Sequence, residues 1–197
     1  MKTSGGLVKP RIQPKQKILP VTTPQRIEKE VTKKRSWVSF QLPKNLSFWF
    51  SRQYQQRFVN QRDVFKWPND APHITVRWGF YTQDVNDIRR VLGSTKPFSV
   101  VQFTGPQIFA LPDSDVLVCR VISPQLDRLY HTLGRVPCET THPDYNPHVT
   151  VAYLRRGHGK FYQDHDFKID PDRRFILRDL RFHNNKRSVQ LNSPGQS

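Results

Sequence analysis

Apolar and polar residues alternate along the chain in short segments that predict strands and helices in turn. Residues 37–42 alternate with a period of two and stop at Pro43, which predicts a strand. Residues 47–59 have a helical spacing of apolar side chains, and Ser47 is a residue type suited to cap that helix. By the same criteria, strands are expected at 73–79, 98–103 with 108–110, 116–122, 149–154, 175–182 and 188–191, and helices at 84–92 and 125–133.

The order of these segments repeats. Strand, helix, proline-containing loop and strand occur at 37–79 and again at 116–154. This repetition predicts an α+β fold of two duplicated lobes, in which antiparallel sheets are flanked by helices. A pseudo-twofold axis between the lobes would bring the last strand of each repeat to one central cleft.

Those two strands begin with nearly the same sequence, PHITV at 72–76 and PHVTV at 147–151. Side chains alternate between the faces of a strand, so His73 lies beside Thr75 and His148 beside Thr150. A lone His-x-Thr is more often an ordinary core histidine, but two copies in matching context favour a shared active site. The opposite faces should pack on helices, with Ile74, Val76, Trp78, Val149, Val151 and Tyr153.

Two imidazoles facing one another suit acid–base chemistry on a phosphodiester. Imidazole titrates near neutral pH, so one ring can take a proton from the attacking oxygen while the other gives one to the leaving oxygen. The threonine hydroxyls can donate to the non-bridging phosphate oxygens. This arrangement requires neither a metal nor another cofactor. The spacing of His142, His158, His165 and Asp166 matches no metal-ligand pattern, so these residues are not expected to form a metal site.

The formal charge of +16 points to a polyanionic partner. Residues 1–35 hold ten Lys and Arg against two Glu, four prolines and no aromatic residue. We therefore expect a disordered basic tail, which is either an arm for nucleic acid or a solvated tether. The domain is expected at 36–192, and residues 193–197 as a flexible C-terminus.

The sequence argues against several classes of protein. No apolar run approaches the roughly 20 residues needed to span a bilayer, and the N-terminus lacks the apolar core of a secretory signal. Cys119 and Cys138 make neither a disulfide framework nor a zinc site. A cytoplasmic protein is expected, in the host cytoplasm if it is viral. Its oligomeric state is left open.

The paired motifs resemble those of the two-histidine (2H) phosphoesterase superfamily, from residue 37 to 191. The resemblance implies the 2H fold, a phosphodiesterase activity, and a catalytic set of His73, Thr75, His148 and Thr150. The context of the second motif, residues 142–161, is similar to the phage nucleases that cut the cyclic di- and trinucleotide signals of CBASS bacterial defence. The resemblance therefore implies a metal-independent phosphodiesterase with such a substrate, acting in phage counter-defence.

Further residues are candidates for substrate binding. Arg77 follows His73 by four residues and is placed on its face of the strand. Aromatic rings can stack on bases, and the cations in the loop after the second motif strand can meet a second phosphate. The substrate-binding candidates are Arg77, Tyr145, Arg155, Lys160, Trp37 and Tyr162, with Phe161 as a further ring.

Three functions stay open. The first is cleavage of 3′,5′ or 2′,5′ bonds in cyclic di- or trinucleotides. The second is processing of RNA ends that carry 2′,3′-cyclic phosphates or 2′,5′ linkages, where a basic tail would help to hold a polymer. The third is a non-catalytic module that binds nucleic acid.

Overall fold

The computed structural model describes residues 35–94, 97–139, 144–163, 170 and 172–191. The elements are β1 (Ser36–Gln41), α2 (Lys44–Phe50), the π-helix η1 (Ser51–Phe58), the 3₁₀ turn η2 (Gln61–Asp63), β2 (Val64–Lys66), β3 (His73–Phe80), α3 (Val85–Leu92), β4 (Ser99–Ala110), β5 (Ser114–Ile122), α4 (Pro124–Leu133), β6 (His148–Arg155), α5 (Gly159–Gln163), β7 (Arg174–Leu177), β8 (Asp179–His183) and β9 (Ser188–Gln190).

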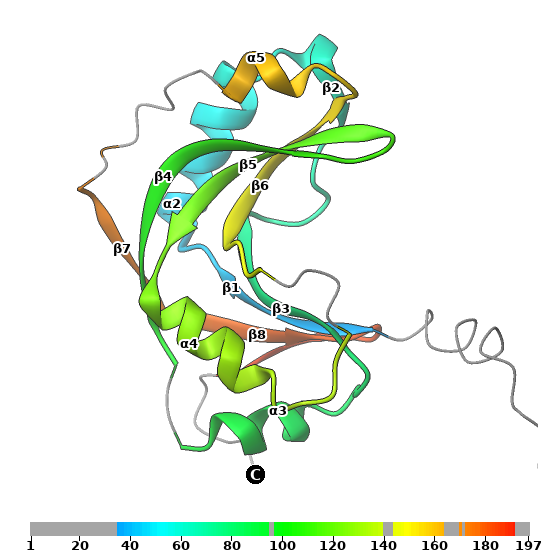
Figure 1. The fold of residues 1–197 in the computed structure, drawn as a ribbon. Coiled ribbons are helices and arrows are strands. Elements are labelled where there is room, and N and C mark those ends of the chain that lie inside the picture. Colours follow the sequence, from blue (N-terminus) through cyan, green and yellow to red (C-terminus); the bar gives the residue numbers. More distant parts are fainter. Residues whose placement is uncertain (1–34, 95–96, 140–143, 164–169, 171, 192–197) are drawn as a thin grey trace, which may run out of the picture.

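One antiparallel sheet curls through the whole domain, in the order β7-β4-β5-β6-β3-β1-β8-β9, with β2 beside β6. Its two halves join where Ile74 of β3 pairs with Val149 of β6. Beyond this point the halves diverge, so that the ribbon has the shape of a C with an open middle (Figure 1). The predicted α+β fold with two lobes and a central cleft is confirmed.

The helices cross between the lobes. The helix that follows β1 continues as η1, which contacts β6 of the second repeat, whereas α4 follows β5 and packs on β3 of the first. Figure 1 shows α2 in the upper lobe and α3 and α4 together under the lower sheet. Each apolar sheet face is therefore covered by a helix from the other repeat, and this exchange buries both lobes in one core.

Local sequence explains where α4 begins. Ser123 has extended backbone angles, and its hydroxyl accepts a hydrogen bond from the backbone N–H of Leu126. Pro124 occupies the first turn, where its missing N–H costs nothing. Leu126 and Leu133 then face the core and are fully buried.

Several predicted boundaries are wrong. The predicted helix at 47–59 begins earlier, at Lys44, and becomes a π-helix after Phe50. The segments 98–103 and 108–110 belong to one strand, β4, which bends at Gly105 where its register with β5 shifts. The expected strand at 175–182 is interrupted between β7 and β8, which pair with β4 and β1 in different parts of the sheet. Three elements were not predicted: η2, β2 and α5.

No helix in the described part of the chain is long and apolar enough to cross a membrane.

Candidate active site

The two motif strands meet at the centre of the cleft. Ile74 and Val149, the middle residues of the two motifs, are paired across β3 and β6 and are fully buried. A cavity of about 760 Å³ opens beside this pair, and Thr75, His148 and Thr150 line it. His73 flanks Ile74 on the Thr75 face of β3, so each lobe brings one imidazole and one hydroxyl to the cleft.

Both imidazoles are held in the same way. Nδ1 of His73 lies 2.9 Å from the Ala71 carbonyl, and Nδ1 of His148 lies 2.7 Å from the Asn146 carbonyl. A carbonyl oxygen only accepts hydrogen bonds, so each Nδ1 carries the proton. The Nε2 atom of each ring is then the site at which a proton can be taken or given.

A β-bulge follows each motif, and it changes the sheet face on which the later side chains of β3 and β6 lie. Opposite β1, the register passes from Thr75 to Arg77 and omits Val76; opposite β5, it passes from Thr150 to Ala152 and omits Val151. An extra residue changes which side the following side chains occupy. Trp78 and Tyr153 were expected to pack on helices, but both line the cavity instead.

The same bulge removes Arg77 from the face of His73. Arg77 is opposite Val38, whose side chain is fully buried on the helix side. Its Nη1 donates to the Tyr130 carbonyl at 3.1 Å, Nε donates to the Cys138 thiol at 3.0 Å, and the guanidinium lies 4.3 Å over the Tyr130 ring. Arg77 borders the cavity, but its charged group is used to hold α4 against β3.

The sheet places two unpredicted polar residues beside the histidines. Gln41 of β1 is directly opposite His73, and Arg120 of β5 is directly opposite His148. Directly opposed residues of an antiparallel pair share a face and lie within about 5 Å at their Cβ atoms. Arg120 is exposed, and among the described residues it is a cation placed to meet a phosphate beside His148.

The hairpin of β4 and β5 forms the apolar wall of the cavity. Ile108, Phe109 and Leu111 line it, and the Phe109 ring meets the His148 imidazole edge to face at 5.0 Å. Nothing in the local sequence marks these residues, because their position depends on how the hairpin folds over β6.

Tyr145 links the two motifs. Its hydroxyl donates to the Thr75 carbonyl at 3.2 Å, and its ring stacks on Tyr130 with centroids 4.4 Å apart. Burial, with the nearby Asp127 and Tyr130, raises the pKa of Tyr145, so the phenol stays protonated and able to donate. The predicted substrate contact is thus a cavity-lining residue that also ties the loop before His148 to β3.

The structure places Trp37 on β1, where its ring stacks on His183 of β8 with centroids 4.8 Å apart and planes 1° apart. His183 was not predicted as a site residue. It lies in the sequence far from both motifs, and only the pairing of β1 with β8 brings it to this position.

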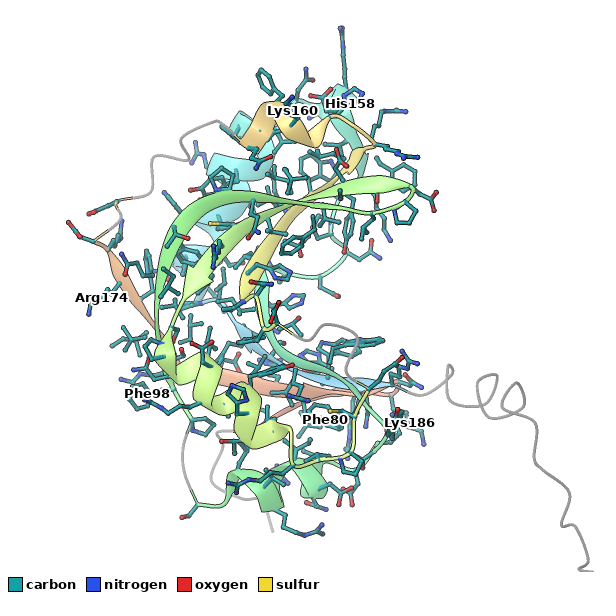
Figure 2. The ribbon with its side chains drawn as sticks, viewed as in Figure 1. Phe80, Phe98, His158, Lys160, Arg174 and Lys186 are labelled. Atoms are coloured by element: carbon teal, nitrogen blue, oxygen red, sulfur yellow. The ribbon has the colours of Figure 1, made fainter. Side chains whose placement is uncertain are left out.

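Three predicted binding residues lie away from the histidines. Tyr162 is fully buried, and its hydroxyl donates to Asp63 at 2.6 Å, so it cannot stack on a base; this prediction was wrong. Arg155 is at the other end of β6 from His148, about 23 Å away at 3.3 Å per residue. Lys160 is exposed on α5, and Figure 2 shows it with His158 at the far end of the upper lobe.

His158 belongs to a separate hydrogen-bonded group. Its Nδ1 lies 2.8 Å from Asp63 Oδ1, beside a hollow of about 450 Å³ that Phe161 also lines. The Tyr162 hydrogen bond, and then His158, lower the pKa of Asp63. Within the described residues, no three His, Cys, Asp or Glu side chains are grouped as a metal site. His142, His165 and Asp166 lie outside those residues.

Comparison with known families agrees with this geometry. A family model described as the 2′-5′ RNA ligase superfamily matches residues 52–159, more than half of the chain, including both motifs. The chain belongs to the 2′-5′ RNA ligase superfamily. As a member of these 2H phosphoesterases it is an enzyme of the phosphodiesterase type. No curated protein matches it significantly.

Solved structures share the superfamily's fold with low sequence identity. Usb1 of Kluyveromyces marxianus aligns with a TM-score of 0.56 at 9% identity, covering 80% of this chain and 97% of that one. Its complex with uridine monophosphate gives 0.52 at 8%, covering 82% and 99%. Escherichia coli LigT with 3′-AMP gives 0.54 at 14%, covering 80% and 93%.

Proposed function

We propose that this protein is a metal-independent phosphodiesterase in which His73 and His148 act as general acid and base. The observation that carries the proposal is the paired geometry of the imidazoles. They stand on adjacent strands at one cleft, and each has its Nδ1 bound to a carbonyl two residues earlier. Because Nδ1 carries the proton, Nε2 is the atom of each ring that takes or gives a proton, one on either side of a phosphate.

In this mechanism one neutral imidazole takes the proton of the attacking hydroxyl, from water or a ribose 2′-OH. The new P–O bond forms as the P–O bond to the leaving oxygen breaks. The other imidazole, protonated at Nε2, gives its proton to that leaving oxygen, so the pair ends with its protons exchanged. Thr75 and Thr150 donate to the non-bridging oxygens, and Arg120 offsets the charge that develops there.

The first substrate class is the cyclic di- or trinucleotide, with a role in phage counter-defence. It is supported by the motif context and by the cavity, whose volume of about 760 Å³ lies in the range of small-ligand sites. Polar groups stand at its centre and apolar groups on the hairpin wall, which suits a compact ligand with both bases and phosphates.

The second class is an RNA end with a 2′,3′-cyclic phosphate or a 2′,5′ linkage. It is supported by the family and by the nucleotides, uridine monophosphate and 3′-AMP, bound to Usb1 and LigT. Arg35 adds a geometric reason. It forms a salt bridge with Glu139 and lies over the Trp78 ring, and both partners line the cavity. Arg35, which follows the basic N-terminal residues in the sequence, therefore stands at the edge of the cleft.

One assay tests the proposal and separates the substrates. Purified protein is incubated with cyclic dinucleotides, cyclic trinucleotides and an RNA 20-mer ending in a 2′,3′-cyclic phosphate, each with and without millimolar EDTA. We expect at least one of these substrates to be hydrolysed, and we expect this hydrolysis to continue in the presence of EDTA. Activity lost in EDTA and restored by zinc or manganese would overturn the metal-independent mechanism. No cleavage of any substrate would favour a binding module.

A variant that lacks residues 1–34 sharpens the comparison. If these residues only hold polymers, turnover of a cyclic dinucleotide should stay within about two- to threefold. Affinity for the 20-mer should fall, with a shallower salt dependence of about 0.7 in the log–log slope per lost phosphate contact. Loss of dinucleotide cleavage in the folded variant would place the segment in the active site and contradict a domain boundary near residue 36.

A further inference from the structure

The cleft side of β3, β1 and β8 carries three rows of side chains that run across the strands. Cross-strand pairing aligns His73, Gln41 and Asp179 in one row and Thr75, Ser39 and Arg181 in the next. The third row is aromatic and comprises Trp78, Trp37 and His183. The bulge at Val76 places Trp78 in this row, because without it Trp78 would face the helices.

We infer that the aromatic row of Trp78, Trp37 and His183 is a platform on which a nucleobase of the substrate stacks. This rests on the proposed function and adds the second half of the binding site. The cavity beside Phe109 binds the group on one side of the scissile phosphate. The platform binds the nucleoside on the other side. Aromatic rings on a sheet face are a recurrent way to bind unpaired bases without requiring a particular sequence.

The rings are accessible and held in place. Trp78 is 41% exposed and lines the cavity, with the Arg35 guanidinium 4.9 Å from its centroid. Trp37 is half-buried and stacks on His183 with parallel planes. Trp37 and His183 cover one face of each other, so a base stacks on an outer face of this pair or on Trp78. The orientation of these rings is already set, and little side-chain entropy is lost on binding.

Polar contacts under the row fix the His183 ring. Nε2 of His183 is 2.9 Å from the hydroxyl of Ser39, which is fully buried. Gln41 Nε2 donates to the same hydroxyl at 3.2 Å, so the Ser39 proton is left to donate to His183. Burial, with His73 and Arg181 nearby, lowers the pKa of His183 to about 4. The ring is therefore neutral at physiological pH, and its contribution is a stacking surface.

The platform lies close enough to serve the catalytic pair. Along β1, Trp37 is two residues from Ser39, the neighbour of Thr75, and four from Gln41, the neighbour of His73. At about 3.3 Å per residue these separations are about 7 and 13 Å. A nucleoside attached to a phosphate that lies between the two histidines and contacts Thr75 spans such a distance, so its base reaches the row while the phosphate stays at the histidines.

The test measures how much affinity a base adds. Dissociation constants for 3′-AMP and for inorganic phosphate are determined by calorimetry on the full chain and on Trp78→Ala, Trp37→Leu and His183→Leu. Trp37→Phe is the conservative variant, which should recover most of the loss. Phe98→Ala is the matched control, because Phe98 is a 51% exposed ring that Figure 2 shows on the outside of the lower lobe. Circular dichroism checks that each variant is folded.

We expect Trp78→Ala and Trp37→Leu to weaken 3′-AMP binding about five- to a hundredfold, the range of base–aromatic stacking, and phosphate binding by less than twofold. The inference is overturned if both ligands weaken equally, or if the variants bind 3′-AMP like the full chain. It is separable from the proposed function. A wild-type protein that binds 3′-AMP more tightly than phosphate, yet cleaves no substrate, supports the platform and not the reaction.

Discussion

The proposed roles of His73 and His148 predict how much activity is lost when either residue is replaced. Replacing His148 by alanine removes one proton-transfer group, which typically lowers the rate 10²- to 10⁴-fold, about 2.7–5.4 kcal/mol in the barrier. The cost in stability should be far smaller. The lost hydrogen bond runs to the carbonyl of Asn146, an exposed residue whose carbonyl can bond to water instead. We expect at most about 1 kcal/mol, or 2–4 °C in Tm for a domain of this size.

The assay compares kcat for His73→Ala, His148→Ala and the double variant on the substrate cleaved fastest by the wild type. Groups that act as a unit are not additive, so the double variant should be within about tenfold of the worse single one. His131→Ala is the control, because His131 is exposed on α4 and is not part of the cleft. A folded His148→Ala protein with wild-type turnover would refute the acid–base assignment. So would losses that multiply in the double variant, since they would mean that the two rings act independently.

Three further predictions concern the residues around the pair. Tyr145→Phe loses the donor to the Thr75 carbonyl and should lower kcat several-fold with about 1 kcal/mol of stability, measured by kinetics and urea unfolding; unchanged kcat would limit Tyr145 to packing. Gly159→Ala puts a Cβ 2.7 Å from Ile108 Cγ2 and 2.8 Å from Asp115 Oδ2 and should cost about 1–3 kcal/mol in urea unfolding. The Asp115 contact stays in an Ile108→Ala background, which should therefore relieve only part of the penalty; equal penalties in the two backgrounds would contradict a clash with Ile108. The folded pKa of His183 is lowered to about 4, so the unfolded chain binds a proton first as the pH falls below about 6.5. Stability should therefore decline from pH 6.5 to 4, by on the order of 1–2 kcal/mol after allowance for partial exposure, and His183→Gln should show a shallower decline in Tm; parallel pH curves would exclude this linkage.

Much of the site can be predicted from sequence because its signals are local. The period-two alternation of the motif strands, the Ser-Pro start of α4 and the repeated His-x-Thr each depend on a few adjacent residues. The repeat also carries its own geometry. Two residues apart on a strand share a face, so His73 and Thr75, and equally His148 and Thr150, could be paired before the fold was known. The order of elements in the two repeats likewise sufficed to predict a duplicated α+β domain.

Tertiary structure decided what stands beside the motifs. The bulges at Val76 and Val151 depend on how β3 and β6 pair with their neighbours, and they turn Trp78 and Tyr153 into the cleft and Arg77 out of it. Gln41, Arg120 and His183 become neighbours of the site only through cross-strand register, which the intrinsic preferences of separate segments do not encode. Tyr162 had an aromatic ring in a suitable place in the sequence, but the packing of α5 buried it against Asp63. Local patterns thus sufficed to predict the proposed acid–base pair and its threonines, whereas long-range pairing determined which side chains surround them.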